Sequence, residues 1–477
     1  MSVRWRTLDE HRPVHSPETY CVSDDLTPYS LRELSRFLRT GELTSLSLFE
    51  RTLSAAEDQD KLGAFVTIAP EIGEAQALDS DRRLKTGQVR PLEGLPVPLK
   101  DVEATRGLRT TNGSLAFHDW VPDTDGGAAN AARKAGATVF LKTNTTEFAL
   151  TEQSDNPLGI TTRNPRNLAL TSGGSSAGAA AAVAAGIIPA AHGSDGAGSV
   201  RLPAALCGII GFKPSYGLIP RYPVSDQWGG RSHHGILGRT VDDVRFAMQG
   251  FARVDSRDPF SFPLTLEKSS STKSIEKLSF AMLDTWGNAY VDPEVKAAVA
   301  VFSDRLEEYG LSRHTVTQTP EVGSVFEKIY LPQLAYDIAQ LDDHHQELIG
   351  DEVRYWVSRA TEIDFQQYMV ARDQRGQLMR WCSEAFAELD FVVLPAQHRL
   401  AWAVDEPNNA ADQRFATSIG ERLQFLAVFN LLGWPAISVP IGQSKDGREI
   451  GIQLACKRGE DAKLLDIAES LQQLFGV

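Results

Sequence analysis

The stretch Thr171-Ser-Gly-Gly-Ser-Ser-Ala-Gly178 places a glycine-serine turn directly before an alanine-rich segment that runs to Gly186. Alanine has the highest helix propensity, so the segment predicts a helix whose small side chains allow close packing. The turn itself allows three interpretations: a tight turn before a buried helix, a phosphate-binding loop, or the site of a nucleophile. A Walker loop would end in Gly-Lys-Ser/Thr, and no lysine stands here. The turn also matches G-x-S-x-G around Ser176, a pattern too common by chance to decide alone.

On both sides of this turn, short apolar runs alternate with helical patterns. The runs are residues 94–99, 137–141, 187–191 and 209–212, and the helical patterns are residues 128–134 and 177–185. Strands that alternate with helices predict an α/β sheet with crossover connections. Further strands are expected at residues 391–395, 436–440 and 450–456.

One large body fits this pattern better than two tandem domains. We expect N-terminal helices in residues 1–60, a catalytic core in 61–245, a mostly helical layer in 250–390 and a return to the sheet in 391–477. Capping boxes are expected at Ser30-Leu-Arg-Glu33 and Ser47-Leu-Phe-Glu50, and a Ser/Lys linker at residues 268–274. The predicted fold is therefore a mixed central sheet covered by helices, with a mostly helical middle insertion.

A second segment, Gly193-Ser-Asp-Gly-Ala-Gly-Ser-Val-Arg-Leu-Pro-Ala204, places a serine after a run of small residues. Small side chains let a ligand oxygen approach the main chain, which is the requirement for an oxyanion hole. The amides expected to converge on such an oxygen are those of Gly196, Ala197, Gly198 and Ser199.

The third informative segment, Gly94-Leu-Pro-Val-Pro-Leu-Lys-Asp101, ends an apolar, proline-stiffened run with a lysine. A buried lysine is unfavourable unless it is paired or neutral. The structural alternative to a functional role is an ion pair of Lys100 with Asp101 or Asp195.

Together the three segments resemble the amidase signature family. The resemblance extends over nearly the whole chain, including Lys142-Thr-Asn-Thr-Thr-Glu-Phe148, Gly211-Phe-Lys-Pro-Ser215 and the closing stretch of residues 429–440. Two departures, Ala177 and Ala197 in place of the usual glycines, keep a small side chain and a backbone N–H.

The resemblance implies a Ser-Ser-Lys triad, with Ser199 as nucleophile, Ser175 as bridging serine and Lys100 as general base. It also implies a cis peptide bond before Ser175 and leaves Ser176 as a bystander or backbone support. Asp195 and Arg201 would hold the oxyanion loop. The substrate pocket is expected beside Ala149, Leu150 and Trp228, although Trp228 could equally be a core residue.

Composition excludes several other classes of function. The formal charge of −14 over 477 residues disfavours general binding to nucleic acid or to a membrane surface. The four scattered cysteines and the absence of an apolar leader favour a cytoplasmic protein. Neither His11-Arg-Pro-Val-His15 nor Asp342-Asp-His-His345 has a convincing metal-ligand geometry, and we expect no metal and no cofactor.

Three functions remain after this reasoning. The first is an amidohydrolase that cleaves a small-molecule amide through an acyl-enzyme on Ser199. The second is the amidase subunit of a tRNA-dependent amidotransferase, which would need a heteromeric partner. The third is a catalytically silent scaffold. The substrate, and whether the chain forms a homodimer, are not predicted.

Overall fold

The computed structural model describes residues 25–223, 230, 232–268, 275–316, 318–406 and 419–475. Its centre is an eight-stranded sheet with the strand order β10-β9-β11-β13-β12-β7-β8-β6. The strands of this sheet are β6 (Ala190–Asp195), β7 (Ile210–Lys213), β8 (His233–Gly238), β9 (Ser279–Met282), β10 (Ser312–His314), β11 (Phe391–Pro395), β12 (Ala436–Gln443) and β13 (Glu449–Ala455).

The sheet is mixed. Strand β9 pairs in parallel with β10 and β11, whereas every pair from β11 to β6 is antiparallel. Strands β6, β7, β8, β11 and β13 are buried along their whole length, as expected for a sheet covered on both faces. This confirms the predicted single body with a mixed central sheet.

Two small sheets lie beside the central one. The first has the order β1-β3-β2 and the second pairs β4 with β5. Their strands are β1 (Phe65–Ile68), β2 (Leu99–Lys100), β3 (Leu141–Thr143), β4 (Arg163–Asn164) and β5 (Asn167–Thr171). The predicted strand at residues 94–99 is wrong except at Leu99, because Pro96 and Pro98 have no N–H to donate to a ladder.

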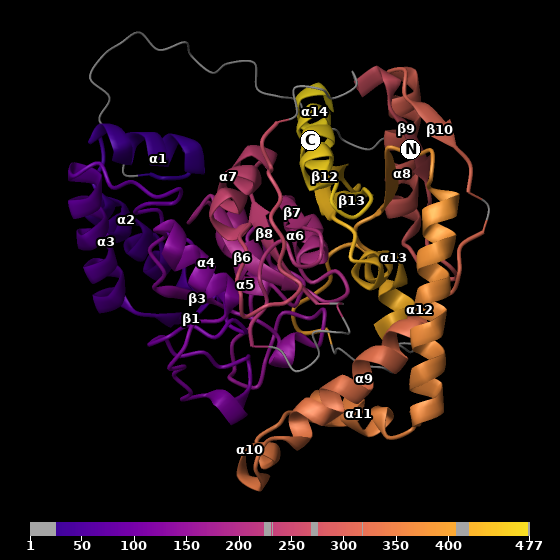
Figure 1. Cartoon of the computed structure of the whole chain (residues 1–477), viewed down its shortest axis with the longest axis horizontal. Helices are drawn as coiled ribbons and strands as arrows, with labels where there is room; N and C mark the ends of the chain where they lie inside the picture. Colours follow the sequence, from indigo (N-terminus) through magenta and orange to yellow (C-terminus); the bar gives the residue numbers. More distant parts are fainter. Residues whose placement is uncertain are drawn as a thin grey trace.

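Helices surround the central sheet (Figure 1). The described residues form α1 (Leu31–Thr40), α2 (Ser45–Asp58), α3 (Pro70–Lys85), α4 (Gly127–Ala135), α5 (Ala177–Ala184), α6 (Arg201–Cys207), α7 (Val241–Phe251), α8 (Pro293–Glu308), α9 (Gly323–Ala339), α10 (Asp343–Glu347), α11 (Asp351–Ala360), α12 (Phe365–Ala385), α13 (Ile419–Leu432) and α14 (Asp461–Phe475). Short 3₁₀ turns are η1 (Asp60–Leu62), η2 (Leu115–Phe117), η3 (Glu147–Ala149) and η4 (Ile275–Lys277).

The N-terminal and middle helices lie at opposite ends of the molecule. Figure 1 shows α1, α2 and α3 on one side of the sheet and α9, α11 and α12 on the other. The middle region is mostly helical, as predicted, but it also supplies β9 and β10 to the sheet, two short strands that the sequence analysis missed. Except for Lys268, the linker expected at 268–274 lies outside the described residues.

Capping confirms one of the two expected helix starts. Ser30 and Glu33 form the predicted capping box at the start of α1. The box at Ser47 and Glu50 is wrong, because the N-cap of α2 lies three residues earlier, at Thr44, whose hydroxyl accepts the Ser47 amide at 3.1 Å. The Ser47 amide, which the predicted box would pair with the Glu50 side chain, therefore donates to Thr44.

The alanine-rich helix α5 is buried from Ala177 to Val183. Its Gly178 lies against the backbone of Ala64 and Asn144, and a Cβ there would clash with both. The small side chains therefore let α5 pack directly on the strands that carry the chemically interesting residues.

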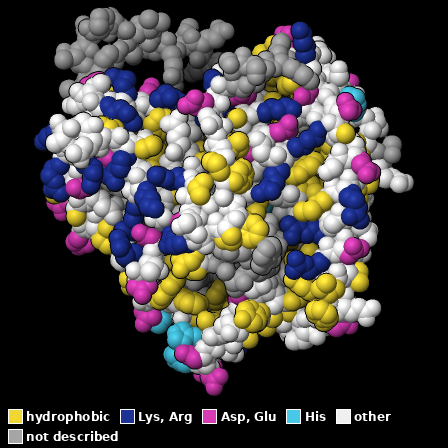
Figure 2. All heavy atoms as spheres, in the orientation of Figure 1, with side chains coloured by type: hydrophobic (Ala, Val, Ile, Leu, Met, Phe, Trp, Pro, Cys, Tyr) yellow, Lys and Arg dark blue, Asp and Glu magenta, His cyan; other side chains and the backbone are white. Residues whose placement is uncertain are grey.

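The surface mixes charged and apolar side chains. On the face drawn in Figure 2, lysine and arginine are scattered on both sides, with acidic and apolar side chains between them. None of the helices in the described ranges is long and apolar enough to cross a membrane.

Candidate active site

Lys100 ends strand β2 with its side chain fully buried. Its Nζ donates to Ser175 Oγ at 2.7 Å and to the carbonyl oxygen of Ser194 at 3.4 Å. Within the described residues Lys100 forms no ion pair, and the Asp101 carboxylate instead accepts the Thr111 amide at 2.9 Å. The structural alternative of a Lys100 ion pair is therefore not what the structure shows.

Burial also sets the protonation of Lys100. Loss of solvent lowers the pKa of Lys100 to about 7, and the charge of Asp195 opposes this shift without cancelling it. A lysine with this pKa is largely neutral above pH 7. It can then accept a proton, which an ordinary lysine cannot do near neutrality.

Ser175 follows a cis peptide bond from Gly174, as the family resemblance implied. A Cβ on Gly174 would lie 2.8 Å from the carbonyl oxygens of Thr151 and Gln153, so the turn has space only for glycine. Ser175 is fully buried against Lys100.

Ser199 precedes helix α6 and is partly exposed in a cavity. Among the described residues, no acceptor takes the amides of Gly196, Ala197 or Ser199, so all three remain available to an oxyanion. Gly198 differs from the expectation, because its amide donates to Asp195 Oδ1 at 2.7 Å. That amide holds the loop instead of facing the cavity.

A buried charge pair holds the Ser199 loop. Arg201 donates to both carboxylate oxygens of Asp195, from Nε at 2.9 Å and from Nη2 at 2.8 Å, and both side chains are fully buried. Asn430 of α13 donates to Asp195 Oδ1 and accepts from Arg201. Burial alone would raise the pKa of Asp195, but Arg201 holds it far below its usual value. The role of Asn430 was not anticipated from the sequence.

Ser176, the centre of the G-x-S-x-G match, is buried away from the cavity. Its hydroxyl donates to the Ser194 carbonyl at 3.2 Å and accepts the Ser194 amide at 3.3 Å. Its own amide donates to the carbonyl oxygen of Ser199 at 3.1 Å. Ser176 therefore joins the turn to β6 and supports the backbone.

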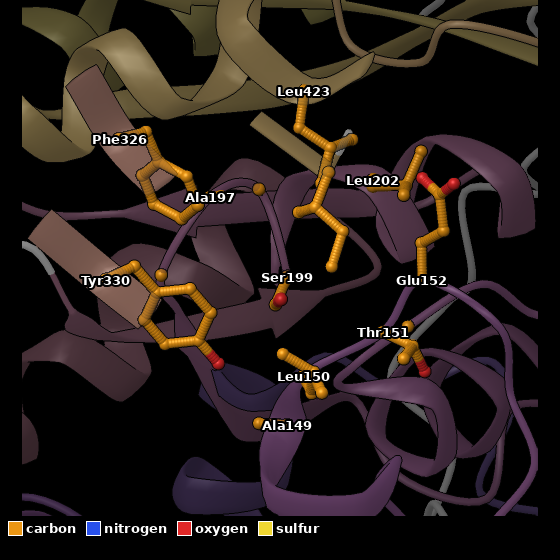
Figure 3. A pocket seen from close by; sticks show the side chains of 14 residues that line it. Ala149, Leu150, Thr151, Glu152, Ala197, Ser199, Leu202, Phe326, Tyr330 and Leu423 are labelled. Atoms are coloured by element: carbon orange, nitrogen blue, oxygen red, sulfur yellow. The ribbon is translucent and has the colours of Figure 1, made fainter. Parts of the chain in front are cut away.

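A cavity lies beside Ser199. It is lined by Ala149, Leu150, Thr151, Glu152, Gly174, Gly196, Ala197, Gly198, Ser199, Leu202, Phe326, Tyr330, Ile419 and Leu423. In Figure 3 the rings of Phe326 and Tyr330 lie across from Ser199, and the Tyr330 hydroxyl points toward the interior. Ala149 and Leu150 line the cavity as expected, and Trp228 lies outside the described residues.

The site has two parts. We name the first part, Lys100, Ser175, Asp195, Ser199 and Arg201, the catalytic floor, because these residues would carry the chemistry proposed below. Phe326 and Tyr330 of α9, with Ile419 and Leu423 of α13, form the apolar wall. The sequence analysis missed the apolar wall. Its one local signal is the spacing of Phe326 and Tyr330, which at i and i+4 lie on one helix face.

Two buried histidines lie behind the catalytic floor. His192 Nδ1 accepts the backbone amide of Lys100 at 3.3 Å, and His192 Nε2 contacts His234 Nδ1 at 2.9 Å. Burial lowers the pKa of both histidines well below the usual value, so both are neutral. Neither histidine contacts a serine hydroxyl of the described residues, so the described part of the site offers no Ser-His pair at these two positions.

Comparison with known proteins identifies relatives along almost the whole chain. A family model described as Amidase matches residues 47–465. The chain is 32% identical to a glutamyl-tRNA(Gln) amidotransferase subunit of Symbiobacterium thermophilum and 31% identical to the corresponding subunit of Roseiflexus sp., each over 93% of this chain and 96% of the relative.

Solved structures share the fold. A bacterial aryl acylamidase of the amidase signature family superposes with a TM-score of 0.85 at 24% identity, covering 93% of this chain and 96% of that one. A structure described as an amidase superposes with a TM-score of 0.80 at 28% identity, covering 94% and 100%. The structure of a glutamyl-tRNA(Gln) amidotransferase subunit from Thermotoga maritima gives 0.77 at 24% identity, covering 95% and 96%.

Proposed function

Because the chain belongs to the amidase signature family, we propose that it cleaves a carboxylic amide through an acyl-enzyme on Ser199. The observation that carries this proposal is the 2.7 Å contact between Lys100 Nζ and Ser175 Oγ, both fully buried, beside the cavity that holds Ser199. A neutral lysine against a buried hydroxyl is a base positioned to activate a serine.

The proton path starts at the nucleophile. Ser199 Oγ attacks the amide carbon and its proton passes to Ser175, while Ser175 passes its own proton to the neutral Lys100. The tetrahedral oxyanion accepts from the amides of Gly196, Ala197 and Ser199. Reversal of the relay protonates the leaving nitrogen, the C–N bond breaks, and an ester remains on Ser199. Water then attacks this ester by the same relay and releases the acid.

One contact of this relay must form with the substrate. Among the described residues the Ser199 hydroxyl makes no hydrogen bond to Ser175 in the free protein. Catalytic hydrogen bonds are often long without substrate and tighten in the complex. Rotation of the Ser199 side chain about χ1 is the smallest change that would bring the two hydroxyls together.

A second candidate function, that of an amidotransferase subunit, uses the same cleavage but passes the released ammonia to another protein. The curated relatives are named as glutamyl-tRNA(Gln) amidotransferase subunits, and this supports an amidotransferase role more than it supports a free amidase. In that role the amide would be glutamine and the ammonia would pass to a partner protein. Among the described lining residues, however, Glu152 is the one with a charged side chain, and a cation for the carboxylate of glutamine is missing from them.

An activity assay of the purified protein distinguishes these functions. Assayed alone on aliphatic, aryl, peptide and ureido amides and on glutamine, a free amidase releases acid and amine from an apolar amide and ignores glutamine. An amidotransferase subunit releases ammonia from glutamine, with turnover that rises when its partner is added. If the protein turned over no amide, either alone or with the partner added, the remaining function would be that of a catalytically silent scaffold.

A further inference from the structure

Glu152 is a charged residue in a cavity whose wall is otherwise largely apolar. It follows Leu150 and Thr151 in the loop that borders Ser199, and its side chain is 7% exposed. Figure 3 shows its carboxylate beside Leu202 at the edge of the cavity. A buried carboxylate in such a place needs donors for both oxygens.

Among the described residues, only one oxygen of this carboxylate has a hydrogen-bond donor. Arg422 Nε donates to Glu152 Oε1 at 3.0 Å. Glu152 Oε2 is buried and accepts no hydrogen bond from the described residues, and His398 Nδ1 lies 3.6 Å away from it. That separation exceeds a hydrogen bond between these atom types.

The carboxylate is nevertheless ionised. Burial would raise the pKa of Glu152, but His398 and the guanidinium groups of Arg422 and Arg399 together keep it below its ordinary value. Because Arg422 already balances its charge, the remaining need of Glu152 is for a hydrogen-bond donor more than for a second cation. A neutral O–H or N–H group satisfies that need without adding charge to the cavity.

We propose that Glu152 is a specificity-determining residue, and that the substrate is an apolar amide carrying a hydrogen-bond donor, such as a hydroxyl or a second amide N–H, which donates to Glu152 Oε2. This rests on the proposed amide cleavage at Ser199. The apolar wall contacts the body of such a substrate, and Glu152 fixes its polar end, so binding orients the scissile carbonyl toward the catalytic floor.

The test compares matched substrates that differ by one group. Two series are used: unbranched amides of four to eight carbons ending in CH₃ or in OH, and acetamides N-substituted with the same chains. At one chain length at least, the hydroxyl member is expected to have a kcat/KM about tenfold above its methyl partner, the scale of one hydrogen bond to a charged group. Amino-terminated members are expected to be turned over no faster than the hydroxyl members, because Arg422 already balances the charge of Glu152, and a clear preference for the amino members would contradict a neutral donor.

Variants assign the preference to Glu152. The double variant Glu152→Met, Arg422→Met removes the carboxylate together with the guanidinium that donates to it, and it should reduce the hydroxyl-to-methyl ratio to about one. Glu147→Gln is the matched control, because Glu147 lies in the same loop but accepts from Ser114 and Gly350 away from the cavity. Its ratio should equal that of the wild type.

Two further results would overturn the proposal: equal turnover of the paired substrates at every length in both series, or a preference that survives in the double variant. Failure of amide cleavage itself is a separate outcome. In that case calorimetry with the Ser199→Ala variant still decides, since tighter binding of the hydroxyl members supports the role of Glu152 and equal binding refutes it.

Discussion

The catalytic floor, which reaches the cavity through Ser199, and the apolar wall, which lines it, are held in different ways. The floor depends on buried polar contacts, such as the bidentate Asp195–Arg201 pair and the Lys100–Ser175 hydrogen bond. The apolar wall consists of side chains from two helices, α9 and α13, packed against each other. A polar contact has one working geometry, whereas apolar packing tolerates exchange. Changes in the floor should therefore abolish turnover, and changes in the wall should alter which amide is preferred.

The largest expected effect is on Lys100. Lys100→Arg keeps a positive charge but cannot deprotonate at accessible pH, so kcat/KM should fall by about 10⁴-fold or more. The wild type should gain activity as pH rises to about 7, where Lys100 loses its proton, and then level off. Activity is measured from pH 5 to 10, and circular dichroism checks that each variant is folded. Substantial activity of a folded Lys100→Arg variant would mean that Lys100 has only a structural role.

Burial of Lys100 should also lower the free energy of unfolding. Its pKa is 10.5 in the unfolded chain and about 7 in the folded one, so burial disfavours folding whenever the unfolded lysine is protonated. Lys100→Met should therefore raise the free energy of unfolding at pH 7 by up to about 5 kcal/mol, at 1.36 kcal/mol per pKa unit. This gain should shrink steadily as pH rises from 7 toward 10.5. A gain that did not vary with pH in urea titrations would contradict a depressed pKa.

Next in size is the support of the Ser199 loop. Arg201→Met leaves Asp195 buried without its partner, and the expected loss of stability is about 3–5 kcal/mol. Arg36→Met, which breaks the exposed pair with Glu42, is the control and should leave the stability nearly unchanged. If the two variants unfolded at similar urea concentrations, the buried pair would not be what holds the floor.

The smallest effect is expected in the apolar wall. Phe326→Leu should lower kcat/KM for bulky apolar amides by about tenfold and leave acetamide nearly unchanged, because the lost contacts lie away from the reacting carbonyl. Tyr336→Ala, on an exposed part of the same helix, serves as the control. An equal loss for both substrates would mean that α9 positions the catalytic floor and does not select the substrate.

The same contrast explains what could be predicted. The residues of the catalytic floor stand in short segments whose glycines and prolines limit the backbone, so local sequence singled out these segments. The resemblance to the amidase signature family then assigned roles to Ser175, Ser199 and Lys100. The hydrogen bond from the Gly198 amide to Asp195 forms only in the folded loop, and the sequence analysis did not predict it. Strand β11 matches its predicted bounds because a fully buried strand reads as a continuous apolar run.

The apolar wall could not be predicted in this way. Phe326 and Leu423 stand about a hundred positions apart, and both resemble ordinary core residues of a helix. Only the packing of α9 on α13 brings them to the cavity. The role of Glu152 is likewise invisible in the sequence, since an unpartnered carboxylate oxygen is a property of three-dimensional surroundings.

Covalent labelling of the nucleophile tests the central claim most directly. The purified protein is treated with a fluorophosphonate, and intact mass followed by peptide mapping locates the adduct. A single adduct on Ser199, formed faster as pH rises through 7 and absent from Ser199→Ala, is the predicted result. An adduct on Ser176, or none on a folded protein, would contradict the acyl-enzyme proposed here.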